Sequence, residues 1–262
     1  RKGDFTNLAG DYTKYRPSYN KDVVETLLKA IAKNRSAVKA ADVGAGTGIF
    51  TKCLIEAGVK DVIAIEPNQD MREAGLKFLE RQIKFLNGSA EKTGLQSNSF
   101  DLVTMASSFH WPNTSEALQE FDRILSPNGV FSALWNPRLT DRSESEQDVE
   151  RLLSIKYNVT SRTSSGLSGI TFDLNEILKT CGVFRSVVYA EAVDVIQRSH
   201  EEYIGAWRSV NDIQSQLGKD KFSEFIDDVA NIIRQYPTVE VHYLTRAWIA
   251  CKEKIAIDTS HY

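Results

Sequence analysis

Apolar residues in the first half of the chain follow two alternating spacings. Short, nearly continuous apolar runs are typical of strands buried on both faces, and they occupy residues 37–43, 61–65, 83–86, 100–106 and 130–135. Between these runs, apolar residues recur three and four positions apart, as in amphipathic helices, at residues 21–33, 49–57, 70–80 and 115–125. Strands that alternate with helices of this length predict a parallel sheet covered by helices on both faces.

The second half of the chain changes pattern after Asn136-Pro137. A polar helix is expected at 143–157, a surface loop rich in Ser, Thr and Gly at 160–169, and a further helix at 174–180. Two late strands, at 186–195 and 239–251, enclose two more helices, and Ser199-His200-Glu201-Glu202 fits a capping box at the start of the first. Because these helices lie between two strands, they predict a cap built onto the sheet.

The expected fold is therefore α/β, with a seven-stranded, mostly parallel sheet, flanking helices and a helical cap. We expect residues 1–20 to form an N-terminal lid segment and residues 21–136 to form the ligand-binding core. Residues 137–262 then supply the cap insertions and the closing strands of the same sheet. A length of 262 residues suits one large domain with an insertion of this kind.

The first strand runs into a glycine-rich turn, Gly44-Ala45-Gly46-Thr47-Gly48, that opens a helix. Glycine permits positive φ and close approach of a ligand, and the amides at the helix start suit an anion. A dinucleotide fingerprint, GxGxxG, would need a third glycine at Ile49, whereas the chain reads D-x-G-x-G-x-G from Asp42. Glu66 follows the second strand, where it can accept both ribose hydroxyls. Asp42 lies under the turn, where it can help to order a ligand ammonium group.

A ribose together with a zwitterionic amino-acid end points to S-adenosylmethionine (SAM). Four stretches carry a wider resemblance: 41–48 (ADVGAGTG), 65–71 (IEPNQDM), 87–95 (NGSAEKTGL) with 99–101 (SFD), and 107–111 (SSFHW). With these stretches the chain resembles the class I SAM-dependent methyltransferases of the type 11 group. Its layout is similar to that of the trans-aconitate methyltransferase branch. The resemblance implies a Rossmann-like core, SAM as the cofactor, and methyl transfer to an oxygen or nitrogen of a small molecule.

The resemblance also implies roles for individual residues. The amino-acid part of SAM would be cradled by Gly44, Gly46 and Gly48. The ribose would be held by Glu66, and the adenine would contact Met71, Ser89 and Ala90, with Ser107 completing the cofactor site.

The segment after the fourth strand offers His110 and Trp111 as catalytic candidates beside the methylsulfonium and the acceptor. An aromatic face stabilises a cation, and a neutral imidazole can receive a proton. The alternative is that His110 bonds to the backbone and Trp111 fills the core. For His110 as a base we favour this alternative, because alignment alone supplies about 7–11 kcal/mol in such displacements.

Two groups of residues are candidates for the acceptor site. Tyr12, Tyr15, Arg16 and Pro17 match a Y-x-x-Y-R-P segment that in this family covers the SAM and acceptor sites, although a helix merely docked on the sheet fits the same pattern. A second group could clamp a carboxylate or phosphate if its members converge: Arg138, Arg162, Trp207, Arg208, His242 and Arg246. The predicted acceptor is therefore an anionic small molecule.

Composition narrows the class of protein further. The net charge of −3 and the absence of a long Lys/Arg cluster argue against nucleic acid as a partner. No apolar run approaches the ~20 residues of a membrane helix, and the first residues lack the apolar segment of a secretory signal, so a cytoplasmic protein is expected. The widely spaced Cys53, Cys181 and Cys251 predict reduced thiols and no metal site. The oligomeric state stays open.

Four other functions compete with this interpretation. An NAD-dependent oxidoreductase is disfavoured because Ile49 stands where the third glycine of its fingerprint would be. An RNA or protein methyltransferase is disfavoured by the net charge, and by the sequence SSFHW where an Asn/Asp-Pro-Pro-Tyr tetrad would be expected. A metal-assisted O-methyltransferase lacks an evident cluster of ligands. A non-catalytic SAM-binding or assembly protein remains compatible with the sequence, because methyl transfer needs few signature side chains.

Overall fold

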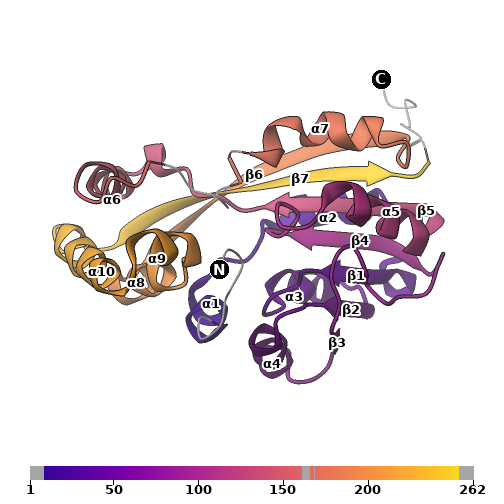
Figure 1. Cartoon of the computed structure of the whole chain (residues 1–262), viewed down its shortest axis with the longest axis horizontal. Coiled ribbons are helices and arrows are strands. Elements are labelled where there is room, and N and C mark those ends of the chain that lie inside the picture. Colours follow the sequence, from indigo (N-terminus) through magenta and orange to yellow (C-terminus); the bar gives the residue numbers. More distant parts are fainter. Residues whose placement is uncertain (1–8, 161–165, 168, 254–262) are drawn as a thin grey trace.

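The computed structural model describes residues 9–160, 166–167 and 169–253 of the chain. Within them a seven-stranded sheet has the order β3-β2-β1-β4-β5-β7-β6 (Figure 1). The strands are β1 (Lys39–Val43), β2 (Asp61–Ile65), β3 (Lys84–Leu86), β4 (Phe100–Ala106), β5 (Leu125–Trp135), β6 (Ser186–Arg198) and β7 (Val239–Cys251). Neighbours from β3 to β5 pair in parallel, and β7 runs antiparallel to both β5 and β6. The predicted mostly parallel α/β sheet is confirmed.

Helices cover both faces of the sheet because successive strand residues point to opposite sides. Ala40 and Leu102 face a cluster formed with α2 (Lys21–Lys29) and α3 (Ile49–Glu56). Their neighbours Ala41 and Val103 face the other cluster, formed with α5 (Thr114–Ile124) and α7 (Ile170–Thr180). A further helix, α4 (Gln69–Phe78), packs against β3 at the edge of the sheet.

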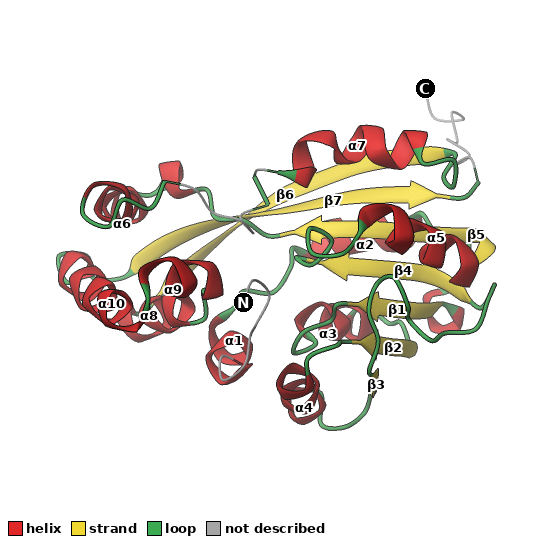
Figure 2. Cartoon of the chain, in the orientation of Figure 1, coloured by secondary structure: helices red, strands yellow, loops and turns green. Residues whose placement is uncertain are grey.

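The cap is a third apolar cluster at the far end of the two long strands β6 and β7 (Figure 2). Its helices are α6 (Glu144–Ile155), α8 (His200–Arg208), α9 (Asn211–Leu217) and α10 (Lys219–Ile233). The predicted capping box at Ser199 and Glu202 opens α8. Val239 and Val241, at the start of β7, are buried among these helices, so the strands that close the sheet also carry the cap.

Several element boundaries differ from those expected. The first core helix ends at Lys29, and a short 3-10 turn, η1 (Arg35–Ala37), precedes β1. Strand β5 begins at Leu125, ahead of the Pro127-Asn128-Gly129 turn. The pairing passes from Phe100–Leu125 directly to Leu102–Val130, so the turn bulges out of a strand that continues on both sides. Helix α9 was not expected, because only Ile213 of its residues is buried and the apolar pattern is correspondingly weak.

Before the sheet, α1 (Ala9–Tyr15) contacts both α4 and α8, and so touches the core and the cap. Another 3-10 turn, η2 (Thr140–Arg142), leads from β5 into α6. None of the helices in the described ranges is long and apolar enough to cross a membrane.

Candidate functional site

The glycine turn after β1 is shaped by backbone conformation. Gly44 and Gly46 adopt φ of 66° and 58°, in the left-handed region that disfavours other residues. A Cβ added at Gly44 would also lie 2.8 Å from Ser108 Oγ, so this position excludes a side chain. The amides of Gly44 and Ala45 donate to the carbonyl of Ile65 at 2.8 and 3.0 Å, which ties the turn to the end of β2.

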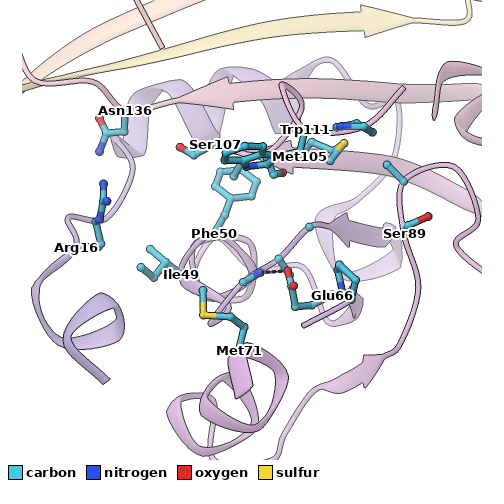
Figure 3. A pocket seen from close by; sticks show the side chains of 18 of the residues that line it. Arg16, Ile49, Phe50, Glu66, Met71, Ser89, Met105, Ser107, Trp111 and Asn136 are labelled. Carbon is cyan, nitrogen blue, oxygen red and sulfur yellow. Dashed lines mark hydrogen bonds between the residues drawn. The ribbon is translucent and has the colours of Figure 1, made fainter. Parts of the chain in front are cut away.

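Glu66 lies directly after β2, and only 8% of the side chain is exposed. Its two carboxylate oxygens accept hydrogen bonds from the amide of Gly46 at 2.9 Å and from that of Asn68 at 2.8 Å (Figure 3). Burial raises the pKa of this carboxyl, while the two amides act in the opposite direction. The carboxylate is therefore fixed beside the glycine turn.

Asp42 is fully buried beneath the turn. The carboxylate accepts hydrogen bonds from Thr51 Oγ1 at 2.6 Å and from Thr104 Oγ1 at 2.9 Å, and burial raises its pKa to about 6. Asp42 lies under the turn as predicted, but it does not line the cavity and its oxygens hold α3 and β4 together, so its predicted part in ordering a ligand ammonium group would be indirect.

A cavity of about 420 Å³ opens at the carboxyl edge of the parallel strands, where ligands bind in open α/β sheets. Glu66, Ser89 and Trp111 lie toward one end of it, and Arg16 and Asn136 toward the other (Figure 3). The predicted cofactor residues that line it are Gly44, Gly46, Glu66, Met71, Ser89, Ala90 and Ser107. Gly48 lies behind the cavity, where a Cβ would meet Leu79 Cδ1 at 2.9 Å, so its glycine serves packing.

Comparisons with known proteins decide the class of this site. Residues 41–133 match a family described as a methyltransferase domain. An uncharacterized methyltransferase of Mycobacterium tuberculosis is 36% identical over 134 residues, which make up 51% of this chain and 52% of that protein. A protein of Saccharomyces cerevisiae named as a SAM-dependent methyltransferase is 32% identical over 130 residues, or 47% of this chain and 43% of its own. Residues 41–133 therefore carry a methyltransferase domain. The chain spans about half the length of the curated relatives it matches.

Solved structures share the fold of this methyltransferase domain and of the cap. A candidate type II methyltransferase from Anaeromyxobacter dehalogenans superposes with a TM-score of 0.65 at 19% identity, covering 91% of this chain and 98% of that one. The phosphoethanolamine N-methyltransferase 2 of Haemonchus contortus, solved with SAM, gives a TM-score of 0.52 at 16% identity, covering 94% of this chain and 56% of that one. At these identities the likeness establishes the fold.

The cofactor that the sequence predicts is SAM, and the residues present fit it. The turn at Gly44 leaves no room for a side chain, so a ligand can approach the backbone. A buried carboxylate, Glu66, stands at the tip of the neighbouring strand, where it suits a ribose. Met71 is buried against Gly46 and lines the cavity.

The two catalytic candidates after β4 lie in different surroundings. Trp111 lines the cavity and is 38% exposed. The His110 ring packs between Trp111 and Trp135, with centroids 4.5 and 6.3 Å away, and it does not line the cavity. Both ring nitrogens are buried without a hydrogen-bond partner among the described residues, and burial lowers the pKa of His110 to about 4. The methyltransferase domain therefore holds this imidazole neutral and away from the cavity wall.

The acceptor candidates of the N-terminal segment separate in the structure. Arg16 lines the cavity, and its Nε donates to Ser209 Oγ at 3.1 Å. Tyr15 packs its ring so closely on Gly205 of α8 that a Cβ there would lie 2.4 Å away, and its hydroxyl donates to Glu201. The side chain of Tyr12 lies outside the described residues.

The acceptor candidates of the second half do not converge on the cavity. Arg138 forms an ion pair with the buried Glu146 at 3.3 Å, and its guanidinium stacks on Trp207 with 4.7 Å to the ring centroid. Arg208 is exposed on α8, and His242 stands on β7 beside Glu240. Arg246 lies on β7, where its guanidinium stacks on Trp248 and donates to the Gly166 carbonyl. Arg162 lies outside the described residues. The predicted clamp is corrected, because Arg138 is already neutralised inside the cap.

Tyr19 and Asn136 are polar cavity residues that were not predicted from the sequence. Tyr19 follows the Arg16-Pro17 pair and shares a hydrogen bond of 2.9 Å with Ser107, and Asn136 follows β5 directly. The position of Asn136 at the carboxyl end of a parallel strand is a signal that could have identified it. Nothing in the sequence around Tyr19 indicates that it lies next to β4.

Proposed function

We propose that this protein transfers the methyl group of SAM to an oxygen or nitrogen of a small anionic molecule. The observation that carries the proposal is one continuous cavity. It joins the glycine turn and Glu66 at the donor end to Arg16 and Asn136 at the acceptor end.

The residues of the chain act by binding and alignment. When bound, SAM supplies an activated methyl group on a positively charged sulfur. Glu66 and the glycine turn hold the donor, and a fixed carboxylate and fixed amides lose little freedom on binding it. His110 is not among the residues that line the cavity, and the proposal assigns it no role as a general base.

An anionic acceptor is supported by the cationic side chain on the cavity wall, although the carboxylates of Glu66 and Glu91 line the cavity as well. Among the described residues that line the cavity, Arg16 is the one with a cationic side chain. Figure 3 shows its guanidinium pointing toward Asn136, away from the Glu66 end. A guanidinium binds a carboxylate or a phosphate through parallel hydrogen bonds, and both acceptor classes therefore belong to the proposal.

The N-terminal segment is proposed to act as a lid over this cavity. Arg16 and Pro17 line the cavity, while Tyr15 is docked on α8 of the cap. A segment that contacts both the core and the cap can exclude water from the reacting groups when it closes.

Calorimetric titration with S-adenosylhomocysteine tests the donor site. We expect the wild type to bind and Glu66→Ala to weaken binding about 10- to 100-fold, because hydrogen bonds to a charged group contribute about 1.5–3 kcal/mol. Glu73→Ala, an exposed carboxylate on the same side of the core, is the matched control and should bind normally. A well-folded wild type without affinity for this compound would disprove the assignment.

A turnover assay tests the acceptor class. Metabolites that carry a carboxylate or a phosphate are screened for formation of S-adenosylhomocysteine from SAM. Turnover confined to neutral amines or sterols would contradict the anionic acceptor. Tight binding without any turnover would favour a SAM-binding protein that lacks activity.

A further inference from the structure

Two hydroxyl groups from distant parts of the chain meet on the cavity wall. Tyr19 lies between α1 and α2, and Ser107 lies at the carboxyl end of β4. Their oxygens are 2.9 Å apart, and both residues line the cavity. Ser107 stands between the Arg16–Asn136 end and the Trp111 end (Figure 3).

The backbone of Ser107 is held in a costly conformation. Its φ is 53°, in the left-handed region that costs a residue with a side chain about 1 kcal/mol or more. The amide of Ser107 donates to the Leu134 carbonyl at 2.7 Å, which fixes this conformation against β5. Strain of this kind persists where the surrounding structure over-determines a position, and it clusters at functional sites.

The Tyr19 ring is fixed from several sides. It packs edge-on against Phe50, with 5.0 Å between the ring centroids. The residue before it, Ser18, accepts a hydrogen bond at its carbonyl from Asn136 Nδ2 at 2.8 Å. The residue after it, Asn20, donates its backbone amide to Thr245 Oγ1 at 2.9 Å. The phenol oxygen is therefore placed by contacts to α3, β5 and β7.

The other polar groups around Ser107 serve different contacts. Ser108 Oγ donates to the Val43 carbonyl, and the Glu66 carboxylate holds two backbone amides. Arg16 donates to Ser209 on the cap side. The hydroxyl pair lines the cavity beside these groups, and each hydroxyl oxygen can both donate and accept.

We propose that the Tyr19–Ser107 pair accepts a hydrogen bond from a proton-bearing nucleophile of the acceptor, a hydroxyl or an amine, and aims its lone pair at the methyl carbon. This inference rests on the proposed function and narrows it to anionic molecules that carry such a nucleophile. The lone pair forms the new bond to carbon, and the carbon–sulfur bond breaks with its electrons remaining on sulfur. An amine keeps its proton as an ammonium, and a hydroxyl loses its proton through the pair to solvent water.

Three variants test the role of the pair. Tyr19→Phe and Ser107→Gly each remove one hydroxyl, and glycine does so without strain at positive φ. Both should lower kcat about 10- to 100-fold, as expected for misalignment at the reacting centre, and leave the Kd for S-adenosylhomocysteine within about twofold. Ser107→Asn restores an acceptor oxygen in a residue that tolerates this backbone, and should recover most of the rate. Tyr157→Phe, which loses a phenol hydrogen bond to Asp228 in the cap, is the control and should be unchanged.

The probes are paired anions with and without a proton-bearing nucleophile. 4-Hydroxybenzoate is compared with benzoate, 3-hydroxybutyrate with butyrate, and phosphoethanolamine with ethyl phosphate. We expect turnover with the first member of a pair and little with the second.

Equal turnover of both members would overturn the inference, because a carboxylate oxygen would then be the nucleophile. An unchanged kcat in Tyr19→Phe with a raised Kd for S-adenosylhomocysteine would also overturn it, since the pair would then only close the donor site. No turnover of any pair by a wild type that binds S-adenosylhomocysteine would contradict this acceptor class and leave the donor assignment standing.

Discussion

The donor end and the acceptor end of the cavity are built by different means. The proposed donor end uses the glycine turn, with its positive φ angles, and the Glu66 carboxylate, which is fixed by backbone amides. The proposed acceptor end uses the side chains of Arg16, Tyr19, Ser107 and Asn136, which come from separate parts of the chain and line the same cavity. The family match, 41–133, includes Ser107 and leaves out the other three. A site formed by the backbone tolerates few residue types at its positions. A site formed by side chains can bind a different ligand when those side chains are exchanged and the fold stays the same.

The largest effect is expected from a comparison of the buried arginine inside the cap with an exposed arginine on α8, neither of which lines the cavity. Arg138→Met leaves Glu146 as a buried carboxylate without its cation, beside the Tyr203 hydroxyl that donates to it at 2.6 Å. The expected loss in the free energy of unfolding is about 3–5 kcal/mol, measured by urea denaturation. Arg208→Met, on the exposed side of α8, should change stability by less than about 0.5 kcal/mol. Similar stabilities for the two variants would mean that Arg138 is not a structural residue.

The buried carboxyl of Asp42, beneath the glycine turn, leads to a prediction about how stability depends on pH. The pKa of Asp42 is raised by burial from about 3.9 in an unfolded chain to about 6, so between these values the folded state binds a proton that the unfolded state releases. Relative to Asp42→Asn, the wild type should therefore lose about 2 kcal/mol of unfolding free energy as the pH rises from about 4 to about 6. Above pH 7 the difference between the two proteins should stay constant. Urea denaturation at a series of pH values measures it, and a difference that rises with pH would contradict the assigned direction.

The same contrast explains which parts of the site could be predicted from the sequence. The glycine turn and Glu66 follow from strict spacing, because glycine is required at Gly44 by φ and by the approach of Ser108. The strands and most helices follow from apolar spacing, since each buries one continuous face.

The residue roles that could not be predicted depended on contacts between distant elements. Arg138 has the residue type of an anion clamp, and only its pairing with Glu146 and its stacking on Trp207 show that it belongs to the cap. Asp42 has the position of a ligand contact, but Thr51 and Thr104 occupy its oxygens. Tyr19 reaches the cavity because Asn136 and Thr245 hold the residues on either side of it, a contact between segments more than a hundred residues apart in sequence.

A substitution of Arg16 tests whether this residue binds the acceptor or the donor. Among the test variants, it has the smallest expected effect. Arg16→Gln removes the cation from the cavity wall and keeps a polar side chain near Ser209. If the guanidinium binds the acceptor, the KM for an anionic acceptor should rise about tenfold, which corresponds to about 1.4 kcal/mol, and the Kd for S-adenosylhomocysteine should stay the same. A change in that Kd with an unaltered KM would assign Arg16 to the carboxylate of the donor. The acceptor end would then begin at the Tyr19–Ser107 pair, and the reason to expect an anionic acceptor would be lost, because no other cation of the described chain lines the cavity.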